Sequence, residues 1–392
     1  MYNEDLNALK PSASMELMQM ARRKLKNGEQ IVDLSGGEPD FDTPRPICDE
    51  AVRQINNGYT HYTVGPGLEE LREKIAYRLK KKKCNYNANG IIVTPGAKYA
   101  IYLALKSLVS AGDEVMYLQP AWVSYEAIIL LASAKPVPVK LNYANGYKLN
   151  LDDLEKRVTK KTKALIINYP NNPTGKVLDA ESEQILLKFL KSHKDILVIS
   201  DEIYDEIVYS EFQNFSLASN KIIEDRVITI NGFSKSYAMT GWRLGYLAAS
   251  DEIARYIYKM FQHTITCVSG FIMKAGIVAL DCNKELEYMR KEYEKRRNYF
   301  VSELNKIPNI HCNYPEGTFY AWVKFDFENI SHEEIYNRVI NKAKIIGVPG
   351  SSYGEEKDIC MRFSFATDKR NLEKAIDSLK REFDKKKLSV IS

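Results

Sequence analysis

The chain has 392 residues, of which 45% are hydrophobic and 27% charged, and a formal net charge of +5. This composition is typical of a soluble globular protein, and the length favours two lobes because one core rarely supports so long a chain. The lysines are interleaved with acids, so nothing supports nucleic-acid binding, and no apolar run is long enough to span a bilayer.

The cysteines and the start of the chain indicate the compartment. The 6 cysteines form no CxxC pair and have no histidine cluster beside them, so reduced thiols are expected rather than a metal or redox site. The polar, acidic segment 1–5 lacks the apolar core of a signal peptide. We therefore expect a cytoplasmic protein that binds neither membrane nor nucleic acid.

The first predicted elements are a helix, a short strand and a turn. Apolar residues at helical spacing predict a helix from Ser14 to Lys26, and Gly28 ends it. Residues 31–34 read as a strand, after which the glycines and proline of 36–39 must turn the chain. The turn alone is sufficient reason for Gly37.

Two helical stretches between residues 43 and 83 follow, and they flank Tyr62. Taken alone, Tyr62 reads as a core aromatic residue. Lys80 to Lys83 form a basic block at the end of the second stretch, where cations suit the helix dipole. A solvated helix end is therefore the preferred interpretation of this block.

From Gly90 to Ala249, apolar strands alternate with helical stretches, which is the pattern of a mainly parallel sheet covered by helices. The expected strands are 91–94, 114–118, 164–168, 197–201 and 227–230. Open α/β sheets bind ligands beyond the carboxyl ends of their strands. The side chains that follow these strands are therefore the candidates for function.

Lys235 follows the last of these strands, between Ser234 and Ser236 in a run of small residues. A lysine in such a place can form a Schiff base with a carbonyl or a cofactor aldehyde. Small neighbours let a planar group approach the backbone, and the hydroxyls together with Arg243 could hold a phosphate. The alternative is a surface lysine in a Ser/Gly loop.

Three other sites have both a functional and a structural interpretation. The start of the predicted helix 99–108, after Pro95-Gly-Ala-Lys98, is an anion site or an ordinary strand–helix turn. Asp201 ends an apolar strand and needs a partner there, unless it caps a helix. Arg362 lies in an apolar, aromatic strand, where it needs an anion such as a substrate carboxylate or the acid of a structural salt bridge.

The rest of the chain reads as a second unit. Residues 250–300 are helical, and the charged stretch 285–297 could link two lobes. Strands are then expected at 318–325, 343–348 and 359–365. We assign 1–45 to an N-terminal arm with part of the small domain, 46–285 to a large domain and 286–392 to a C-terminal small domain.

Eight segments in order resemble the class I pyridoxal-phosphate aminotransferases. Asn231 to Gly245 matches the family's lysine signature, and the other segments are 34–44, 62–72, 94–98, 120–125, 168–175, 200–204 and 361–366. The resemblance covers nearly the whole chain and is greatest to the bacterial and archaeal aspartate aminotransferase branch. It implies the α/β fold type I, in which a large domain with a mainly parallel sheet binds pyridoxal phosphate and a smaller α/β domain packs beside it.

The resemblance also implies which residues bind the cofactor. Lys235 would carry it, and the freed amine would move the proton of the substrate's Cα as catalytic base and acid. Asp201 would keep the pyridine nitrogen protonated, which makes the ring an electron sink. The residues that match the family's cofactor site are Lys235, Asp201, Tyr204, Asn172, Trp122, Ala97, Lys98, Ser234, Arg243 and Tyr62.

Within this set, Trp122 would stack on the ring, and Tyr204 and Asn172 would bind its phenolic oxygen. Tyr62 would reach the phosphate of the neighbouring subunit, which implies a homodimer with shared active sites. Gly232 stands where some relatives have serine, so one hydroxyl to the phosphate is expected to be missing.

The implied substrate site centres on Arg362, which would grip the α-carboxylate close to Gly37, Trp122 and Asn172. A dicarboxylic substrate needs a second cation, which Lys98 or Lys10 would supply unless both are ordinary surface lysines. The hypothesis is aspartate with 2-oxoglutarate, by ping-pong kinetics. The alternatives are an aromatic or alanine-type aminotransferase, or a pyridoxal-phosphate lyase on the same fold.

Two further alternatives are not enzymes. An aminotransferase-like effector module of a transcription regulator would need a DNA-binding domain, and only about nine residues precede the first family-like motif. A general α/β binding protein would not need Lys235, Asp201 and Arg362 together. An aminotransferase is therefore the preferred interpretation.

Overall fold

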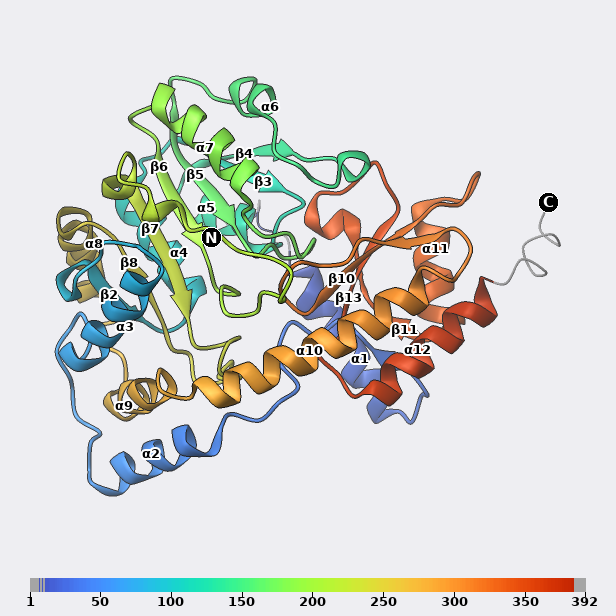
Figure 1. Cartoon of the computed structure of the whole chain (residues 1–392), viewed down its shortest axis with the longest axis horizontal. Coiled ribbons are helices and arrows are strands. Elements are labelled where there is room, and N and C mark those ends of the chain that lie inside the picture. The colour runs from blue at the N-terminus through green and yellow to red at the C-terminus, as the bar shows by residue number, and fades with distance from the viewer. Residues whose placement is uncertain (1–6, 8, 10, 384–392) are drawn as a thin grey trace.

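The computed structural model describes residues 7, 9 and 11–383. A seven-stranded sheet and an antiparallel sheet of four strands form the two halves of the molecule. The long helix α10 (Asn283–Leu304) runs from one half to the other (Figure 1). No helix among the described residues is long and apolar enough to cross a bilayer.

The large sheet is mainly parallel, as predicted. Its strand order is β2-β8-β7-β6-β5-β3-β4, and β8 alone runs antiparallel to its neighbours β2 and β7. The strands are β2 (Ile91–Thr94), β3 (Glu114–Gln119), β4 (Lys135–Lys140), β5 (Thr162–Asn168), β6 (Leu197–Asp201), β7 (Val227–Gly232) and β8 (Gly245–Ala248).

Helices cover both faces of this sheet, which explains why its strands are apolar without alternation. Ile92 and Ile166 belong to a core with helices α4 (Ala97–Leu108), α5 (Ser124–Leu131) and α8 (Asp251–Thr264). Val93 and Ile167 point to the opposite core. That core is formed with α2 (Arg45–Asn56), α3 (Glu69–Lys81), α6 (Leu151–Glu155), α7 (Ala180–Ser192) and α9 (Gly270–Ala279).

Strand β4 was not predicted from the sequence. It contains Pro136 and Pro138, which normally argue against a strand because proline has no N–H to donate. In the structure β4 is one of the two edge strands and pairs only with β3. The open side of an edge strand makes no ladder bonds, so prolines are tolerated there.

The smaller half is built on the sheet β12-β13-β10-β9. Its strands are β9 (Ile310–Cys312), β10 (Tyr320–Phe325), β12 (Val348–Pro349) and β13 (Cys360–Ser364), and its helices are α1 (Ala13–Lys26), α11 (His332–Asn337) and α12 (Lys369–Glu382). The N-terminal strand β1 (Val32–Asp33) pairs in parallel with β11 (Ile345–Ile346). The N-terminal segment is thereby joined to the C-terminal part of the chain.

The single strand expected at 343–348 is wrong. Gly347 separates β11 from β12, and the two strands belong to different sheets. A Cβ at Gly347 would lie 2.3 Å from the ring of Phe363, so the backbone packs directly on that ring. The apolar pattern on both sides of the glycine concealed this break, because both short strands are buried.

Candidate active site

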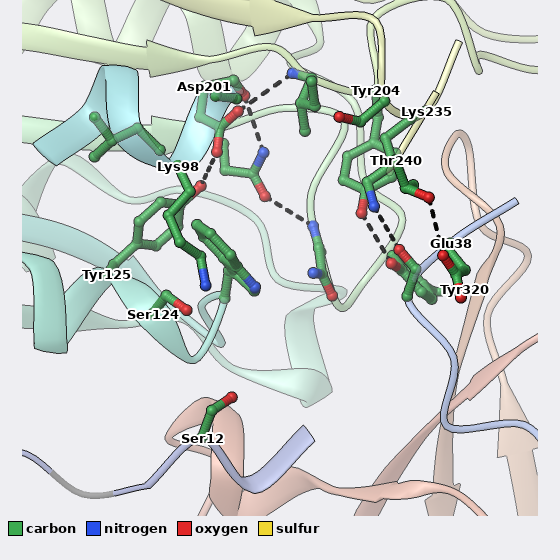
Figure 2. Close-up of a pocket in the computed structure, with 18 of the residues that line it drawn as sticks. Ser12, Glu38, Lys98, Ser124, Tyr125, Asp201, Tyr204, Lys235, Thr240 and Tyr320 are labelled. Carbon is green, nitrogen blue, oxygen red and sulfur yellow. Dashed lines mark hydrogen bonds between the residues drawn. The ribbon is translucent and has the colours of Figure 1, made fainter. Parts of the chain in front are cut away.

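The carboxyl ends of β5, β6 and β7 border a cavity of about 320 Å³ (Figure 2). Side chains from both halves of the molecule line it. The predicted residues among them are Gly37, Ala97, Lys98, Trp122, Asn172, Asp201, Tyr204, Ser234, Lys235, Arg243 and Arg362. Residues from distant parts of the sequence therefore meet at the strand ends, where such a sheet is expected to bind its ligand.

Lys235 lies in the loop after β7, and its Nζ donates a hydrogen bond to the carbonyl oxygen of Gly37. Burial is the largest influence on this amine. Together with the positive charges of Arg362 and Arg243, it lowers the pKa of Lys235 to about 8, against the opposing effect of Glu38 and Asp201. An amine with such a pKa is partly unprotonated near neutral pH and suits both nucleophilic attack and proton transfer.

Asp201 ends β6, and its side chain is buried. It accepts hydrogen bonds from the Tyr125 hydroxyl (2.5 Å) and the Ile203 N–H (3.3 Å). Burial raises the pKa of the Asp201 carboxyl to about 6, although these hydrogen bonds oppose the shift. No helix follows Asp201, so the helix-cap interpretation is wrong. The described residues supply no ion-pair partner, which leaves this carboxylate suited to a cationic ligand atom.

Arg362 on β13 is 3% exposed. Its Nη1 donates to the Asn172 side-chain oxygen (3.0 Å) and its Nη2 to the Ser35 carbonyl (2.8 Å). The guanidinium lies 4.1 Å from the centre of the Tyr320 ring, and its Nε has no partner among the described residues. No described acid pairs with it, so the structural salt bridge is excluded within this part of the chain. A guanidinium held by neutral acceptors keeps its charge for an anionic ligand.

A chain of hydrogen bonds links Arg362 to the strand ends. The side-chain oxygen of Asn168 accepts from the Asn172 N–H (2.9 Å), and the Asn168 amide donates to the Asp201 carbonyl (2.9 Å). Near it, the hydroxyls of Tyr204 and Tyr320 are 2.8 Å apart. The Arg362 guanidinium is thus linked through Asn172 and Asn168 to the backbone of Asp201 at the edge of the sheet.

The start of α4 forms a second polar corner of the cavity. The first N–H groups of a helix have no acceptor within it and attract anions. Gly96 precedes the helix with a φ of +90°, and a Cβ there would lie 2.5 Å from Arg243 Nη2. Only glycine lets the guanidinium approach so closely. Ser234 also lines this cavity, whereas Ser236 does not.

The residue at position 232 is constrained by packing. A Cβ on Gly232 would lie 2.9 Å from the Cα of Gly245 on the neighbouring strand. A serine would therefore require β7 and β8 to move apart. This agrees with the expectation that one hydroxyl is absent, and it adds a physical reason for the absence.

Lys98 is a further cation in the cavity, in addition to Lys235, Arg243 and Arg362. Its Nζ lies 4.9 Å from the centre of the Trp122 ring, and none of the described acids pairs with it. Burial, with the charge of Arg243, lowers the pKa of Lys98. Figure 2 shows Lys98 on the side of the cavity opposite Glu38, facing the region of Ser12 and Ser124.

With this geometry in view, the comparisons with known proteins are decisive. The chain matches the family "Aminotransferase class I and II" over residues 29–379. This chain belongs to that family. It is 38% identical to an aspartate aminotransferase of Pyrococcus abyssi over 99% of both chains, and 37% identical to aromatic-amino-acid aminotransferase 2 of Thermococcus litoralis over 98% of this chain and 99% of that one.

A solved structure is also similar to this aminotransferase. The aspartate aminotransferase of Thermus thermophilus with maleate superposes with a TM-score of 0.91 at 30% identity, covering 97% of this chain and 99% of that one. The fold type I architecture and the resemblance to the aspartate aminotransferase branch are thereby confirmed.

The family implies pyridoxal phosphate, and the residues of this aminotransferase fit that group. An aldehyde needs an amine, which Lys235 provides at the cavity wall. A phosphate needs cations and free N–H groups, which Arg243 and the start of α4 offer. A pyridine nitrogen needs a carboxylate, and the buried Asp201 has no other described ion partner.

Two predicted residues are not placed at this cavity. Tyr62 is 88% exposed and does not line it, so its interpretation as a core aromatic residue is wrong. Lys10 lies outside the described residues. The roles predicted for these residues remain hypotheses.

The structure adds residues whose roles were not predicted. Tyr125 binds Asp201, Tyr320 packs on the Arg362 guanidinium, and Glu38 faces Lys235. Tyr125 and Glu38 stand within the family-like segments, so their positions could have drawn attention. Tyr320 carried no such indication, because its contact depends on the pairing of β10 with β13.

Proposed function

We propose that this aminotransferase uses pyridoxal phosphate to transfer the amino group of L-aspartate to a 2-oxo acid, with 2-oxoglutarate as the acceptor. One observation carries the proposal: apart from Lys235 and Arg243, which are assigned to the cofactor, the cavity contains two further cations, Arg362 and Lys98, that no described acid neutralises. A dicarboxylic substrate offers one carboxylate to each. The similar Thermus aspartate aminotransferase was solved with maleate, which is also a dicarboxylate.

Some residues of the cavity would bind the cofactor and the substrate, and Lys235 would transfer the proton. The phosphate would be held by Arg243, Ser234 and the start of α4, the ring by Trp122, Tyr204 and Asn172, and its nitrogen by Asp201. When bound, the cofactor supplies an electron sink for the charge that develops at the substrate's Cα. The Lys235 amine would take the proton from the substrate's Cα as base and deliver it as acid to the C4′ carbon of the cofactor. Arg362 fixes the α-carboxylate by its planar fork, which orients the Cα–H bond.

A neutral or aromatic substrate is the second candidate. Trp122 and Tyr125 line the cavity beside Lys98, together with Met15 and Met18 of α1. These side chains suit an apolar substrate, and one similar protein is named an aromatic-amino-acid aminotransferase. A lyase on the same fold would release ammonia instead of converting the cofactor to its amine form.

Replacing Lys98 with alanine is expected to raise KM for aspartate by about 10- to 100-fold, since a charge-assisted hydrogen bond contributes about 1.5–3 kcal/mol. KM for phenylalanine should change little. Steady-state kinetics with both amino acids measure the effect. Lys106→Ala, on the same helix but outside the cavity, is the matched control, and Lys10→Ala tests the other predicted cation. Unchanged aspartate kinetics in both Lys98→Ala and Lys10→Ala, with phenylalanine preferred, would refute the aspartate hypothesis.

The first experiment is the visible absorption spectrum of the protein with pyridoxal phosphate, before and after L-aspartate is added without an acceptor. A cofactor band that converts to that of the amine form supports the cofactor, the half-reaction and the acidic substrate together. A band that responds only to phenylalanine or alanine keeps the aminotransferase and changes its substrate. The absence of any lysine-linked band would contradict the role of Lys235.

We also propose a cytoplasmic homodimer in which Tyr62 completes the partner's phosphate site. The support is the exposure of Tyr62 and of the apolar side chains Val64 (57%) and, on α2, Val52 (56%), which a partner could cover.

A hybrid dimer tests this sharing. One subunit carries Lys235→Ala and the other Tyr62→Ala. The hybrid should recover wild-type cofactor affinity at its single lysine-bearing site, because that site receives the unaltered Tyr62, while the Tyr62→Ala homodimer binds the cofactor more weakly. Titration of the lysine-linked absorption band measures both affinities. Equal affinities in the hybrid and the Tyr62→Ala homodimer would argue against a shared site.

A further inference from the structure

Glu38 is a cavity side chain to which the proposed function gives no role. It follows Gly37 in the turn after β1 and lines the cavity. Figure 2 shows it beside Thr240, on the same side as Lys235 and away from Lys98. Asp201 and Glu38 are the acids among the described lining residues, and Asp201 is assigned to the ring nitrogen. Glu38 is therefore the remaining negative charge.

Two contacts join the turn of Glu38 to the loop of Lys235. The Glu38 carboxylate accepts a hydrogen bond from the Thr240 hydroxyl (2.9 Å). The preceding carbonyl, that of Gly37, accepts from Lys235 Nζ. The Thr240 carbonyl in turn accepts from Arg243 Nη1 (2.8 Å). The segment that faces the lysine amine is thus fastened to the loop that carries the lysine.

Charged groups of both signs surround the Lys235 amine and shift its protonation in opposite directions. The groups that face it are Arg362 on β13, Arg243 in the loop before β8, Asp201 and Tyr204 at the end of β6, Tyr320 on β10, and Glu38. The two guanidinium groups favour a neutral amine, and Asp201 and Glu38 favour the protonated one. With Asp201 paired to a cationic ring nitrogen, Glu38 becomes the main negative charge that opposes the effect of the two guanidinium groups on Lys235.

We propose that Glu38 is a positioning residue for Lys235: through Thr240 it holds the Gly37 carbonyl opposite Nζ, and its carboxylate offsets the charges of Arg243 and Arg362 at that nitrogen. This inference rests on the proposed function. It assigns to the turn after β1 an influence on the protonation of the lysine nitrogen, in addition to the substrate contact that the resemblance implies for Gly37.

The test is Glu38→Gln in the full chain loaded with pyridoxal phosphate. Loss of the negative charge should lower the pH at which the absorption spectrum of the bound cofactor changes, because the protonated lysine nitrogen loses a stabilising neighbour. Asp42→Asn is the matched control, since it removes the same charge from an exposed residue of the same segment outside the cavity. Asp42→Asn should leave this pH unchanged.

A second readout does not depend on the cofactor. In the cofactor-free full chain, an amine-reactive reagent labels Lys235, and peptide mass spectrometry follows the rate against pH. Glu38→Gln should label about threefold faster at pH 7, which corresponds to a fall of about half a unit in the pKa of Lys235. Thr240→Val should raise the limiting rate at high pH by freeing the Gly37 turn, and Thr240→Ser should restore it.

An unchanged transition pH and an unchanged labelling profile in Glu38→Gln would overturn the inference. An equal fall of the transition pH in Asp42→Asn would also overturn it, because the effect would then come from the net charge of the protein. If the wild-type protein gives no cofactor band, the proposed function fails, and the labelling profile still decides the role of Glu38.

Discussion

Lys235→Ala is expected to abolish transamination while the fold persists. In the proposed mechanism the variant loses both the covalent attachment of the cofactor and the base that moves the Cα proton, and a general base alone contributes about 10²- to 10⁴-fold. A loss of at least about 10⁴-fold in kcat is therefore expected. Single-turnover conversion of the cofactor by aspartate, followed by absorbance, measures the chemical step directly.

The fold of this variant should survive because the contact that Lys235 makes is a hydrogen bond to a backbone carbonyl, and the described acids form no ion pair with it. Circular dichroism and the thermal midpoint should match those of the wild type. Exogenous methylamine should restore part of the rate, since a small amine can enter the space left by the side chain. Near-normal transamination by the variant would remove the basis of the assignment.

Asp201→Asn is expected to lower kcat by up to about 100-fold. The neutral amide cannot stabilise a protonated ring nitrogen, and a lost charge-assisted hydrogen bond of up to about 3 kcal/mol corresponds to that factor. KM should change less, because Asp201 lies beside the ring nitrogen in the proposed arrangement and not at the carboxylate site. Stopped-flow measurement of the aspartate half-reaction separates the two effects.

Tyr125→Phe is the matched control for this substitution. It removes the hydrogen bond of 2.5 Å to the carboxylate but leaves the negative charge. Because the hydroxyl bond opposes the effect of burial, its loss should raise the pKa of Asp201 further. The rate should then fall modestly at low pH and recover as the pH rises. Equal losses in Asp201→Asn and Tyr125→Phe would show that geometry, and not charge, is what Asp201 contributes.

The sheet and most of the site could be predicted because local patterns determine them. Apolar strands buried on both faces are visible as runs, and the functional groups stand just after them, as Asp201 and Lys235 do. The parallel order then brings these groups to one edge without further information. The end of the helix before Gly28 could also be predicted from a local pattern. Glycine commonly ends a helix because it accommodates a positive φ, which is +78° at Gly28.

The features that could not be predicted depend on contacts between distant parts of the sequence, which no local pattern reveals. Strand β4 was concealed by its prolines, and the break at Gly347 by the apolar residues around it. The partners of Arg362 were also hidden: Ser35 and Asn172 lie 327 and 190 residues away in the sequence. The guanidinium could be recognised as a group in need of an anion, but only the tertiary structure shows that neutral acceptors hold it.

These sequence separations also determine the order in which parts of the site can form during synthesis on the ribosome. The strands β2 to β8 are complete once residue 248 has been made, so Lys235, Asp201 and the start of α4 can assemble while synthesis continues. More than 300 further residues must be synthesised after Ser35 before its hydrogen-bond partner Arg362 exists. A nascent chain therefore acquires the groups that are proposed to face the cofactor well before it acquires Arg362, the proposed partner of the substrate carboxylate. A chain that stops short of β13 never acquires Arg362.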